Sequence, residues 1–398
     1  FVLTEPTALN IASSTFENIS CNGLTDGSIN VIVSGGVSTY TYAWTVSGGG
    51  TDISASTAAN QTGLATGTYS VIATDLNGCT IPKSFTITQP DELTIADVTV
   101  STAIACFGEN QTIKVNVTQG STAPYIYSIS GSASETSAAT TDLTYEFNVP
   151  VGTYTVKVTD ANGCYKEFVT TLTQPTAALA VSGDMRAYNG GFQISCNGVS
   201  DGEIDTTVTG GTIGSGYDYV WTVSGGGTDI SASKAADHIG LKAGTYTVVV
   251  TDANGCIETD SYTLTQPVVL AVSGDMRAYN GGFQISCNGV SDGEIDTTVT
   301  GGTIGSGYDY VWTVSGGGTD ISASKAADHI GLKAGTYTVV VTDANGCIET
   351  DSYTLTQPDV LAIAETIPKY NGFQITCFGA SDGKIDLAIS GGTEAYQY

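Results

Sequence analysis

The sequence predicts an all-β protein made of tandem immunoglobulin-like β-sandwich domains arranged end to end. Short stretches of alternating apolar and polar residues are separated by glycine-rich turns, and 50 of the 398 residues are glycine. No segment shows a convincing helical period. Similar blocks recur about every 90 residues, a period longer than that of a solenoid unit, so each block can enclose its own core.

Proline marks the boundaries of the blocks, because VLTEP, ITQP and three copies of LTQP each close one of them. We expect residues 1–6 to be the tail of a preceding repeat, and the chain to be a segment of a longer protein. The predicted repeats are residues 7–90, 91–175, 176–267 and 268–358, followed by a partial fifth repeat at 359–398. Residues 179–267 and 270–358 are identical.

The sequence GTYTVVVTDANGC at residues 244–256 predicts a strand that enters a tight hairpin. Tyr246, Val248 and Val250 alternate with their neighbours and are expected to face inward. The outward position between the two valines is Lys157 in the second repeat, so this face contacts water. Asn-Gly then favours the left-handed turn of a hairpin, and the chain returns as the strand CIETDSYTLTQP.

Two further strands are predicted upstream of this hairpin. Ile204, Thr206 and Val208 alternate on one, and Tyr219, Trp221 and Val223 alternate on the next. Trp221 falls where strand C of an immunoglobulin-like domain carries its core tryptophan, and Leu241-x-x-Gly244-x-Tyr246 is similar to the tyrosine corner before strand F. The second repeat has the smaller Ile129 at the tryptophan position, so we expect it to be less stable.

The charge of the chain excludes two classes of partner. It has 39 acidic and 12 basic residues, a formal charge of −27, whereas nucleic acids and anionic membranes require basic patches. No apolar run reaches the length of a membrane helix. Because 41% of the residues are apolar, the chain is also not a disordered acidic tail.

The motifs that suggest catalysis do not form a catalytic site in the predicted fold. GVSDG at 198–202 and 289–293 fits the G-x-S-x-G nucleophile elbow, but that elbow requires a following helix, and here a strand follows. The only histidines, His238 and His329, occupy equivalent positions in the identical copies, and the first two repeats have none. We expect both to be exposed residues at a strand edge, and we predict that this segment is not an enzyme.

Calcium is the one cofactor that the sequence suggests. Asp201 and Asp252 lie in glycine-rich turns, and Asp292 and Asp343 are their copies. Hard oxygen ligands suit calcium, and a site could form between Asp201 of one repeat and the TDANG turn of the next. Aspartate and asparagine are also ordinary turn formers, so a purely structural role is the alternative.

The segments CNGVSDGEIDTTVTGG, YDYVWTV, GLKAGTYTVVVTDANGC and YTLTQP together resemble the SprB repeat, a family named for the large surface adhesin of gliding bacteria. The resemblance extends over the four complete repeats and the partial fifth. The second repeat departs from the pattern, because its CFGENQTIKV lacks the Ser-Asp-Gly. Single motifs are less specific, since GTYTV…TD is also similar to PKD-type domains.

The resemblance implies export by type IX secretion, display on the cell surface with outer-membrane attachment through other regions, and a filament that grips a substratum. It implies the gliding and type IX secretion machinery as partners, also through regions outside this segment. Asp-Thr-Thr at 205–207 and 296–298 resembles the short O-glycosylation sequon of this bacterial phylum, which makes Thr206 and Thr297 candidate glycan sites. An exposed strand edge is the alternative interpretation.

Nine cysteines suggest disulfides and an oxidising exterior. The simple interpretation pairs the two cysteines within each repeat. In an immunoglobulin-like topology, however, they would lie at the A–B and F–G turns, about 25 Å apart, whereas a disulfide needs Cα atoms within about 7 Å. In a head-to-tail array, the A–B end of one repeat would face the F–G end of the next. The pairs would then be Cys21–Cys164, Cys106–Cys256 and Cys196–Cys347, leaving Cys79, Cys287 and Cys377 unpaired. The sequence leaves both pairings open.

Two functions remain. The first is a structural stalk of a surface adhesin, whose partners are the other repeats and an extracellular surface or polysaccharide. The second is a multivalent carbohydrate- or calcium-binding module of a secreted protein, in which weak sites gain strength by number. An exact duplication lengthens the chain without changing its surface, which favours the stalk.

Overall fold

The computed structural model describes residues 1–100, 103–118 and 122–397. The chain divides into two compact units. The first contains Phe1–Leu179 with Gly210–Thr212 and Asn254–Cys256, and the second contains Ala180–Thr209, Ile213–Ala253 and Ile257–Tyr398. Among the described residues, the only helical segments are two three-residue 3-10 turns, at Asn189–Gly191 and Asn280–Gly282. The predicted all-β, tandem immunoglobulin-like fold class is confirmed.

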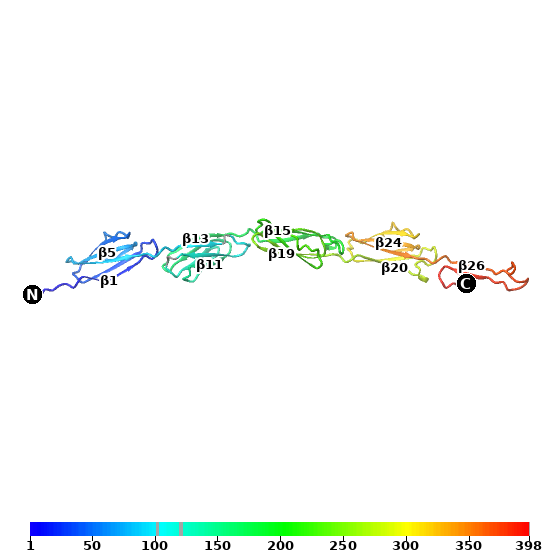
Figure 1. The fold of residues 1–398 in the computed structure, drawn as a ribbon, viewed down its shortest axis with the longest axis horizontal. Helices are drawn as coiled ribbons and strands as arrows, with labels where there is room; N and C mark the ends of the chain where they lie inside the picture. The colour runs from blue at the N-terminus through cyan, green and yellow to red at the C-terminus, as the bar shows by residue number, and fades with distance from the viewer. Residues whose placement is uncertain (101–102, 119–121, 398) are drawn as a thin grey trace. The chain divides into compact units, whose positions relative to one another are not determined.

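The first repeat is a sandwich of two three-stranded antiparallel sheets, with the orders β1-β2-β4 and β3-β5-β6. In immunoglobulin lettering these are strands A, B and E against C, F and G, and Figure 1 shows β1 and β5 in the first body of strands. Inward residues of both sheets, including Trp44, Tyr69 and Val31, form one buried cluster. The strands are β1 (Asn10–Glu17), β2 (Gly27–Ser34), β3 (Thr41–Ser47), β4 (Gln61–Leu64), β5 (Gly67–Thr74) and β6 (Thr80–Ile87).

The second repeat has the same plan with one added short strand, in the orders β11-β8-β7 and β10-β9-β12-β13. Ile129 pairs with Val156 as Trp44 pairs with Val71, so isoleucine does occupy the tryptophan position. Tyr127 stacks on a neighbouring tyrosine at 5.4 Å and helps to fill this core. The lower stability of this repeat stays a prediction. The strands are β7 (Ile95–Val100), β8 (Gln111–Val117), β9 (Ile126–Gly131), β10 (Glu135–Thr136), β11 (Thr144–Val149), β12 (Gly152–Thr159) and β13 (Tyr165–Leu172).

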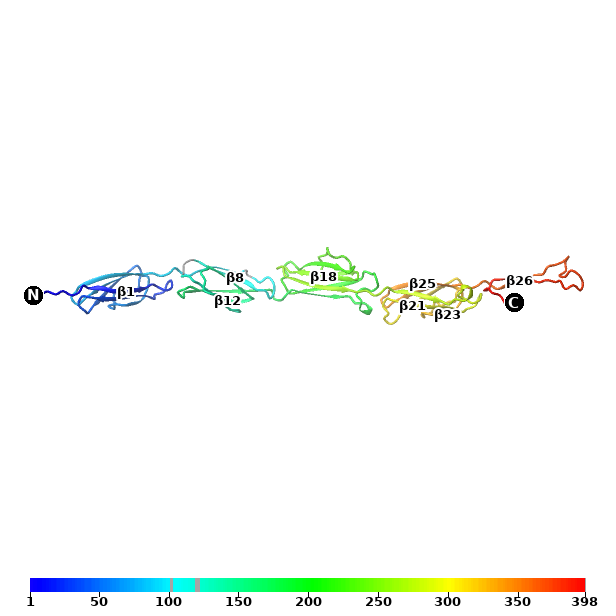
Figure 2. The same cartoon turned by 90° about the horizontal axis from the view of Figure 1, so that it is seen from below.

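The third and fourth repeats share one topology because they share one sequence. Their sheet orders are β14-β15-β17 with β16-β18-β19, and β20-β21-β23 with β22-β24-β25. Figure 2 shows β21, β23 and β25 in one body of strands. The third repeat has β14 (Ala180–Met185), β15 (Gly202–Thr209), β16 (Asp218–Ser224), β17 (His238–Leu241), β18 (Gly244–Thr251) and β19 (Ile257–Leu264). The fourth has β20 (Ala271–Met276), β21 (Gly293–Thr300), β22 (Asp309–Ser315), β23 (His329–Leu332), β24 (Gly335–Thr342) and β25 (Ile348–Leu355).

The predicted tyrosine corner forms in the third repeat. The Tyr246 hydroxyl donates a hydrogen bond to the Lys242 carbonyl at 2.8 Å and accepts one from the Thr228 backbone N–H at 2.8 Å. The loop beneath it requires glycine, because a Cβ on Gly244 would lie 2.7 Å from the Cα of Gly227. The corner therefore fixes the loop between β16 and β17 onto the start of β18.

Buried clusters follow the predicted repeats. One lies within residues 7–90, one within 91–175 and one within 268–358. Residues 359–397 contain β26 (Ala362–Thr366) and β27 (Asp386–Ser390), which form a two-stranded ladder with largely exposed side chains. We propose the proline-bounded repeat as the structural domain, since each complete block supplies both sheets of a sandwich.

Candidate functional site at the repeat junctions

The A–B turn, between the first two strands of a repeat, is organised by an aspartate. In the first repeat the Asp26 carboxylate accepts hydrogen bonds from the Ser20 backbone N–H, at 3.1 Å, and from the Ser20 hydroxyl. The serine hydroxyl holds the pKa of Asp26 below its usual value. Asp201 is equivalent and accepts from the Ser195 backbone N–H at 3.2 Å, as does Asp292 from Ser286 at 3.1 Å. These aspartates stabilise the turn that carries the first cysteine.

The F–G turn is organised by a second, buried aspartate. Asp343 is only 6% exposed, and its carboxylate accepts backbone hydrogen bonds from Thr303, Asn345 and Cys347 at 2.7–2.9 Å. Asp252, its copy in the third repeat, is equally buried. Asp75 is the corresponding residue of the first repeat, and the hydrogen bond from the Val37 backbone N–H is the main cause that lowers the pKa of its carboxyl. The TDANGC sequence thus forms a rigid turn that presents the second cysteine.

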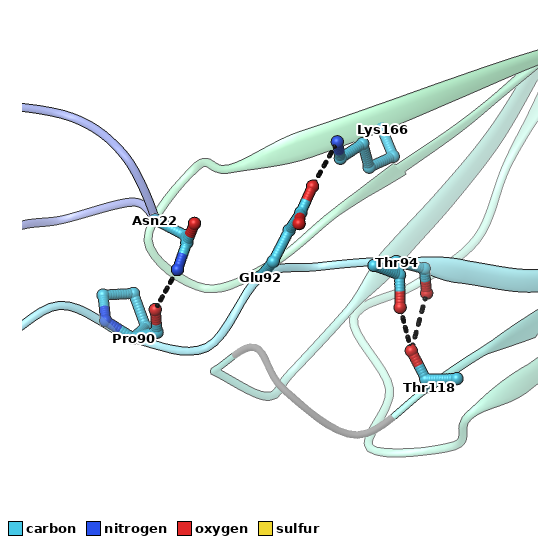
Figure 3. Close-up of polar contacts among 6 residues, drawn as sticks. All are labelled: Asn22, Pro90, Glu92, Thr94, Thr118 and Lys166. Carbon is cyan, nitrogen blue, oxygen red and sulfur yellow. Dashed lines mark hydrogen bonds and ion pairs between the residues drawn. The ribbon is translucent and has the colours of Figure 1, made fainter.

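The end of each repeat is fastened to its own A–B turn. The Gln89 side-chain oxygen accepts a hydrogen bond from the Gly23 backbone N–H at 2.9 Å, and Asn22 Nδ2 donates to the Pro90 carbonyl at 3.0 Å. Figure 3 shows the second contact. The same arrangement recurs at Gln266 with Gly198 and at Asn197 with Pro267. The Gln-Pro at the end of LTQP therefore brings the exit of a repeat beside its first cysteine.

Three disulfides join the A–B turn of one repeat to the F–G turn of the following repeat. Their Cα–Cα distances are 5.5–5.7 Å, within the usual range. The pairs are Cys21–Cys164, Cys106–Cys256 and Cys196–Cys347. These are the pairs of the head-to-tail alternative, and no cysteine in the described part of the chain is paired within its own repeat. Cys79, Cys287 and Cys377 are free and exposed.

An asparagine two residues before the second cysteine binds the main chain of the preceding repeat. Asn162 Nδ2 donates to the Ser20 carbonyl at 3.2 Å, and Asn254 Nδ2 donates to the Ala105 carbonyl at 3.1 Å. Asn345 does the same to Ser195 at 3.2 Å. In each case the acceptor directly precedes the first cysteine of the disulfide. This role was not predicted from the sequence, although the constant asparagine of TDANGC was the available signal.

Each of these asparagines also contacts its own repeat. Its amide donates to a threonine hydroxyl at 3.0–3.1 Å, in Thr122, Thr212 and Thr303 respectively. A disulfide sulfur lies 3.3 Å from the same carbonyl that accepts the asparagine. The three junctions therefore share one local geometry, which positions the two cysteines of a pair.

Next to the junction between the first two repeats, the second repeat has further polar contacts of its own (Figure 3). Lys166 on β13 pairs with Glu92 at 2.7 Å, and the Thr118 hydroxyl contacts both the hydroxyl and the carbonyl of Thr94. The ion pair is half-exposed, so it contributes at most about 1 kcal/mol. Beside it, a cavity of about 360 Å³ is lined by the disulfide, Asn22 and Leu93.

We expect the Asn345→Ala variant to weaken the junction of the third and fourth repeats. The variant loses the bonds to Ser195 and Thr303, and also a 3.0 Å bond from the Asn189 backbone N–H to the Asn345 side-chain oxygen. Unpaired junction groups cost about 1–3 kcal/mol. Reduction of Cys196–Cys347 by dithiothreitol, followed by thiol alkylation, should become about tenfold faster.

The matched control is Asn77→Ala in the first repeat. Asn77 has the same place in its F–G turn, but the nearby Cys79 is free. The backbone N–H of Asn77 donates a hydrogen bond to the Asp75 carboxylate, and alanine keeps this bond. This variant should leave the reduction rate of every disulfide unchanged. Equal rates in wild type and Asn345→Ala would show that the asparagine does not hold the junction.

The described residues contain no cluster of side chains that would support the predicted calcium site. Within the described parts of the chain, no three histidine, cysteine, aspartate or glutamate side chains are grouped to hold a metal ion. Asp343 uses its carboxylate on three backbone N–H groups, and Asp201 and Asp292 bind the turn that precedes them. Calcium binding stays a prediction.

The histidines lie on the edge strands β17 and β23, as predicted, but they are half-buried and not exposed. His238 begins β17 and packs edge-on against Trp221, with ring centroids 5.0 Å apart, and its Nε2 is buried. His329 repeats this contact with Trp312 at 5.1 Å. The predicted exposure was wrong because the short strand turns this side chain over the core tryptophan. Burial lowers the pKa of both imidazoles below the usual value.

Acidification should therefore destabilise the third and fourth repeats through these histidines. As pH falls below about 6.5, the unfolded chain takes up the protons first, because its imidazoles keep the higher pKa, so stability is lost. The double variant His238→Gln, His329→Gln should lose less stability between about pH 7 and pH 5. Glutamine is the matched replacement, since Gln61 occupies this position in the first repeat and donates to the Ala58 carbonyl at 2.8 Å. Urea unfolding at each pH measures the effect, and identical pH slopes would contradict it.

The candidate glycosylation sites are buried. Thr206 and Thr297 are each 8% exposed and face the core from β15 and β21, with the hydroxyl oxygen covered. Tyr262 lies beside Thr206 and is 3% exposed, and burial raises the pKa of its hydroxyl to about 12. Glycosylation of these threonines stays a prediction, whereas the alternative of an exposed strand edge is wrong, because β15 and β21 are central strands. Alternation with Ile204 and Val208 places them inward.

Together, the strand orders and the junctions define a tandem array of immunoglobulin-like sandwiches in which successive repeats are cross-linked by disulfides. The family model for the SprB repeat matches residues 13–49, 193–226, 284–317 and 374–398. The matched segments therefore lie in the first, third and fourth repeats and in the partial fifth. The second repeat, 91–175, contains no matched segment, in agreement with its missing Ser-Asp-Gly. No curated protein matches the chain significantly.

The chain also matches solved structures at low identity and low TM-score. The N-terminal eight Ig domains of Down Syndrome Cell Adhesion Molecule isoform 1.30.30 are 13% identical with a TM-score of 0.28, over 89% of this chain and 55% of that one. The present chain thus spans about half of that structure. The insect immune protein hemolin is 15% identical with a TM-score of 0.22, over 83% of this chain and 94% of that one. Extracellular domains 3-5 of Drosophila OTK are 10% identical with a TM-score of 0.21, over 66% of this chain and 97% of that one. At these values the fold assignment depends on the strand orders.

Proposed function

We propose that this segment is a structural stalk of a large cell-surface adhesin that serves attachment and gliding motility. One observation carries the proposal: every junction between complete repeats has a disulfide between consecutive repeats, placed by the same asparagine. A covalent link at every junction resists separation of the repeats under load. Repetition of one sandwich adds length without new chemistry, so the segment has a mechanical and not a catalytic role.

The proposed location is extracellular, with outer-membrane attachment and contact with the gliding and type IX secretion machinery through other regions. Disulfides persist in oxidising compartments, which supports this location. No helix among the described residues has the length and apolar character needed to cross a membrane. The partners of the segment are its own neighbouring repeats and an extracellular surface or polysaccharide.

An in-frame deletion of residues 91–358 tests this function in the cells that produce the protein. We expect antibody against the first repeat to label intact cells of both strains, while attachment to glass and gliding speed fall in the deletion strain. Deletion of residues 270–358 alone, one of the duplicated blocks, is the matched control and should have a smaller effect. Unchanged attachment with full surface display would overturn the proposal, as would the absence of labelling.

A second candidate function is multivalent binding of carbohydrate or calcium. A groove of about 520 Å³ on the second repeat favours it, because Lys166, Glu167 and Phe168 on β13 line it together with Thr94 to Val98 at β7. Two charged side chains of opposite sign beside an aromatic ring could contact a sugar. Binding of the full chain to a glycan array, lost on Phe168→Ala, would support this function. Binding that is unaffected by this change would exclude the groove.

A further inference from the structure

We propose that the disulfides convert this single chain into two parallel covalent load lines, the first of which leaves the central strands of each repeat outside the path of tension. The inference deepens the proposed stalk function and depends on it for its biological meaning. It follows from which cysteines are joined, and it does not depend on how the repeats are oriented. Its elements are the three disulfides and the chain segments between them.

The first load line passes through every second junction. Tension that reaches Cys21 crosses the sulfurs to Cys164, without passing through the intervening chain. It then follows residues 165–195 to Cys196 and crosses to Cys347. The two disulfides remove 143 and 151 residues from this path.

The second load line uses the remaining junction. It runs from Cys79 along residues 80–105 to Cys106 and crosses to Cys256. Because Cys79 is free, tension enters this line through the central strands of the first repeat. It then follows residues 257–286 to Cys287. The two lines are parallel in their covalent connections, because each line contains the chain segments that the disulfides of the other line bypass.

Both lines are built from the same parts of the repeat. Each segment between disulfides contains strand G of one repeat, the Gln-Pro, and strand A of the next. In the first line these strands are β13, with eight residues, and β14, with six. These strands are already near their full length, at about 3.3 Å per residue, so the strand residues of each segment contain little slack.

The hydrophobic core lies between the lines. Strands β15 to β18 occupy the chain between Cys196, on the first line, and Cys256, on the second. Trp221 and Tyr246, both fully buried, belong to this stretch. It bridges the two lines and is not in series with either. Unfolding of this core would therefore release almost no length along a loaded line.

The effect on extensibility is large. Pulled by its ends, the disulfide-bonded chain reaches about 350 Å when every repeat is unfolded, at about 3.4 Å per residue. The reduced chain reaches about 1,350 Å, close to four times as far. Pairing within each repeat would instead allow about 550 Å, so the limiting extension distinguishes the two arrangements.

The experiment is single-molecule force spectroscopy on the full chain, held by tags at its two ends. Cys79, Cys287 and Cys377 are first alkylated without reduction, so that these exposed thiols cannot form further links. We expect a limiting extension of about 350 Å without reductant and about 1,350 Å with it.

Cys21→Ser should lengthen the unreduced chain by about 380 Å, because the first line is interrupted. The shortest remaining path crosses from Cys106 to Cys256, returns through residues 255–197 to Cys196, and crosses to Cys347. In this variant the core of the third repeat is in series with the load. Pairing within repeats predicts a gain of only about 200 Å for the same change.

Cys106→Ser is the matched variant that makes the proposal specific. It breaks the second line only, so the first line still sets the limit and the extension should stay at about 350 Å. Pairing within repeats predicts a gain of about 200 Å for this same variant. That gain, or a limit near 1,350 Å for unreduced wild type, would overturn the two-line arrangement. Far-ultraviolet circular dichroism checks that each variant is folded. Reduction of the wild type on the same instrument gives the extension of the chain without disulfides, so a lost disulfide can be distinguished from misfolding.

Failure of this inference and failure of the stalk function are distinguishable. Normal cell attachment after the deletion of residues 91–358 would overturn the function and leave the extension limits intact. Loss of attachment in the deletion strain, combined with a long extension of the unreduced chain, would retain the function and overturn the two load lines.

Discussion

Trp221→Ala should destabilise the third repeat by about 3–5 kcal/mol, the cost of removing a large side chain from a packed core. The indole is 1% exposed, and its Nε1–H donates to the Ala235 carbonyl at 2.9 Å. It also contacts His238 and lies 6.2 Å from the Tyr262 ring. Loss of the indole leaves a cavity between the sheets and an unpaired carbonyl. Urea unfolding followed by far-ultraviolet circular dichroism measures the change, because the variant has no tryptophan left in the third repeat.

The duplication provides an internal reference for this measurement. Trp312 in the identical fourth repeat is equally buried, so its emission should report an unchanged transition in the same molecule. Val220→Ala, at the neighbouring outward position that is 41% exposed, should change stability by less than about 0.5 kcal/mol. If Trp221→Ala and Val220→Ala unfold at the same urea concentration, Trp221 does not organise the core.

Cys196→Ser should cost about 5 kcal/mol through loss of the disulfide to Cys347. The bond closes a loop with a sequence separation of 151, and a loop of that length restricts the unfolded chain by about that amount in the entropic treatment. Thermal unfolding of the oxidised chain measures the loss. Added reductant should bring wild type and variant to the same stability, since the difference between them is the disulfide.

The control for this variant is Cys287→Ser, at the equivalent A–B turn of the fourth repeat. Cys287 is free and exposed, so its replacement should leave stability unchanged. Mass spectrometry of the alkylated Cys196→Ser protein should find Cys347 as the newly free thiol. A free Cys256 in its place would establish pairing within the repeat and contradict the junction disulfides.

Local sequence patterns predicted the strands and their faces. The alternation of Tyr246, Val248 and Val250 assigned an inward face, and all three residues are fully buried in β18. Gly255 takes the positive φ of 87° that the Asn-Gly turn requires. Ile129 replaces tryptophan in the same register against Val156. These features succeed because strand periodicity and turn conformation depend on residues close together in the chain.

The junction could be predicted only in part. The sequence placed the two cysteines at opposite ends of a repeat, but the partner of each depends on which turns meet across more than 140 residues. The constant asparagine of TDANGC was a signal for the donor, but nothing in the sequence indicated that the Asn345 amide binds the Ser195 carbonyl, since a main-chain acceptor has no side-chain signature. The same limit explains His238, whose contact with Trp221 joins different sheets.

By itself, the sequence determined an all-β chain of repeated sandwiches, with alternating residues that define the inner faces and cysteines at two turns. Only the tertiary structure decided that these turns are joined from one repeat to the next, that the Asp343 carboxylate accepts hydrogen bonds from backbone N–H groups, and that Thr206 is buried. The physical reason is the distance along the chain over which each interaction acts. Periodicity and turn preference act over a few residues, whereas disulfide pairing, burial depth and hydrogen-bond partners depend on strands that are distant in sequence and meet only after folding.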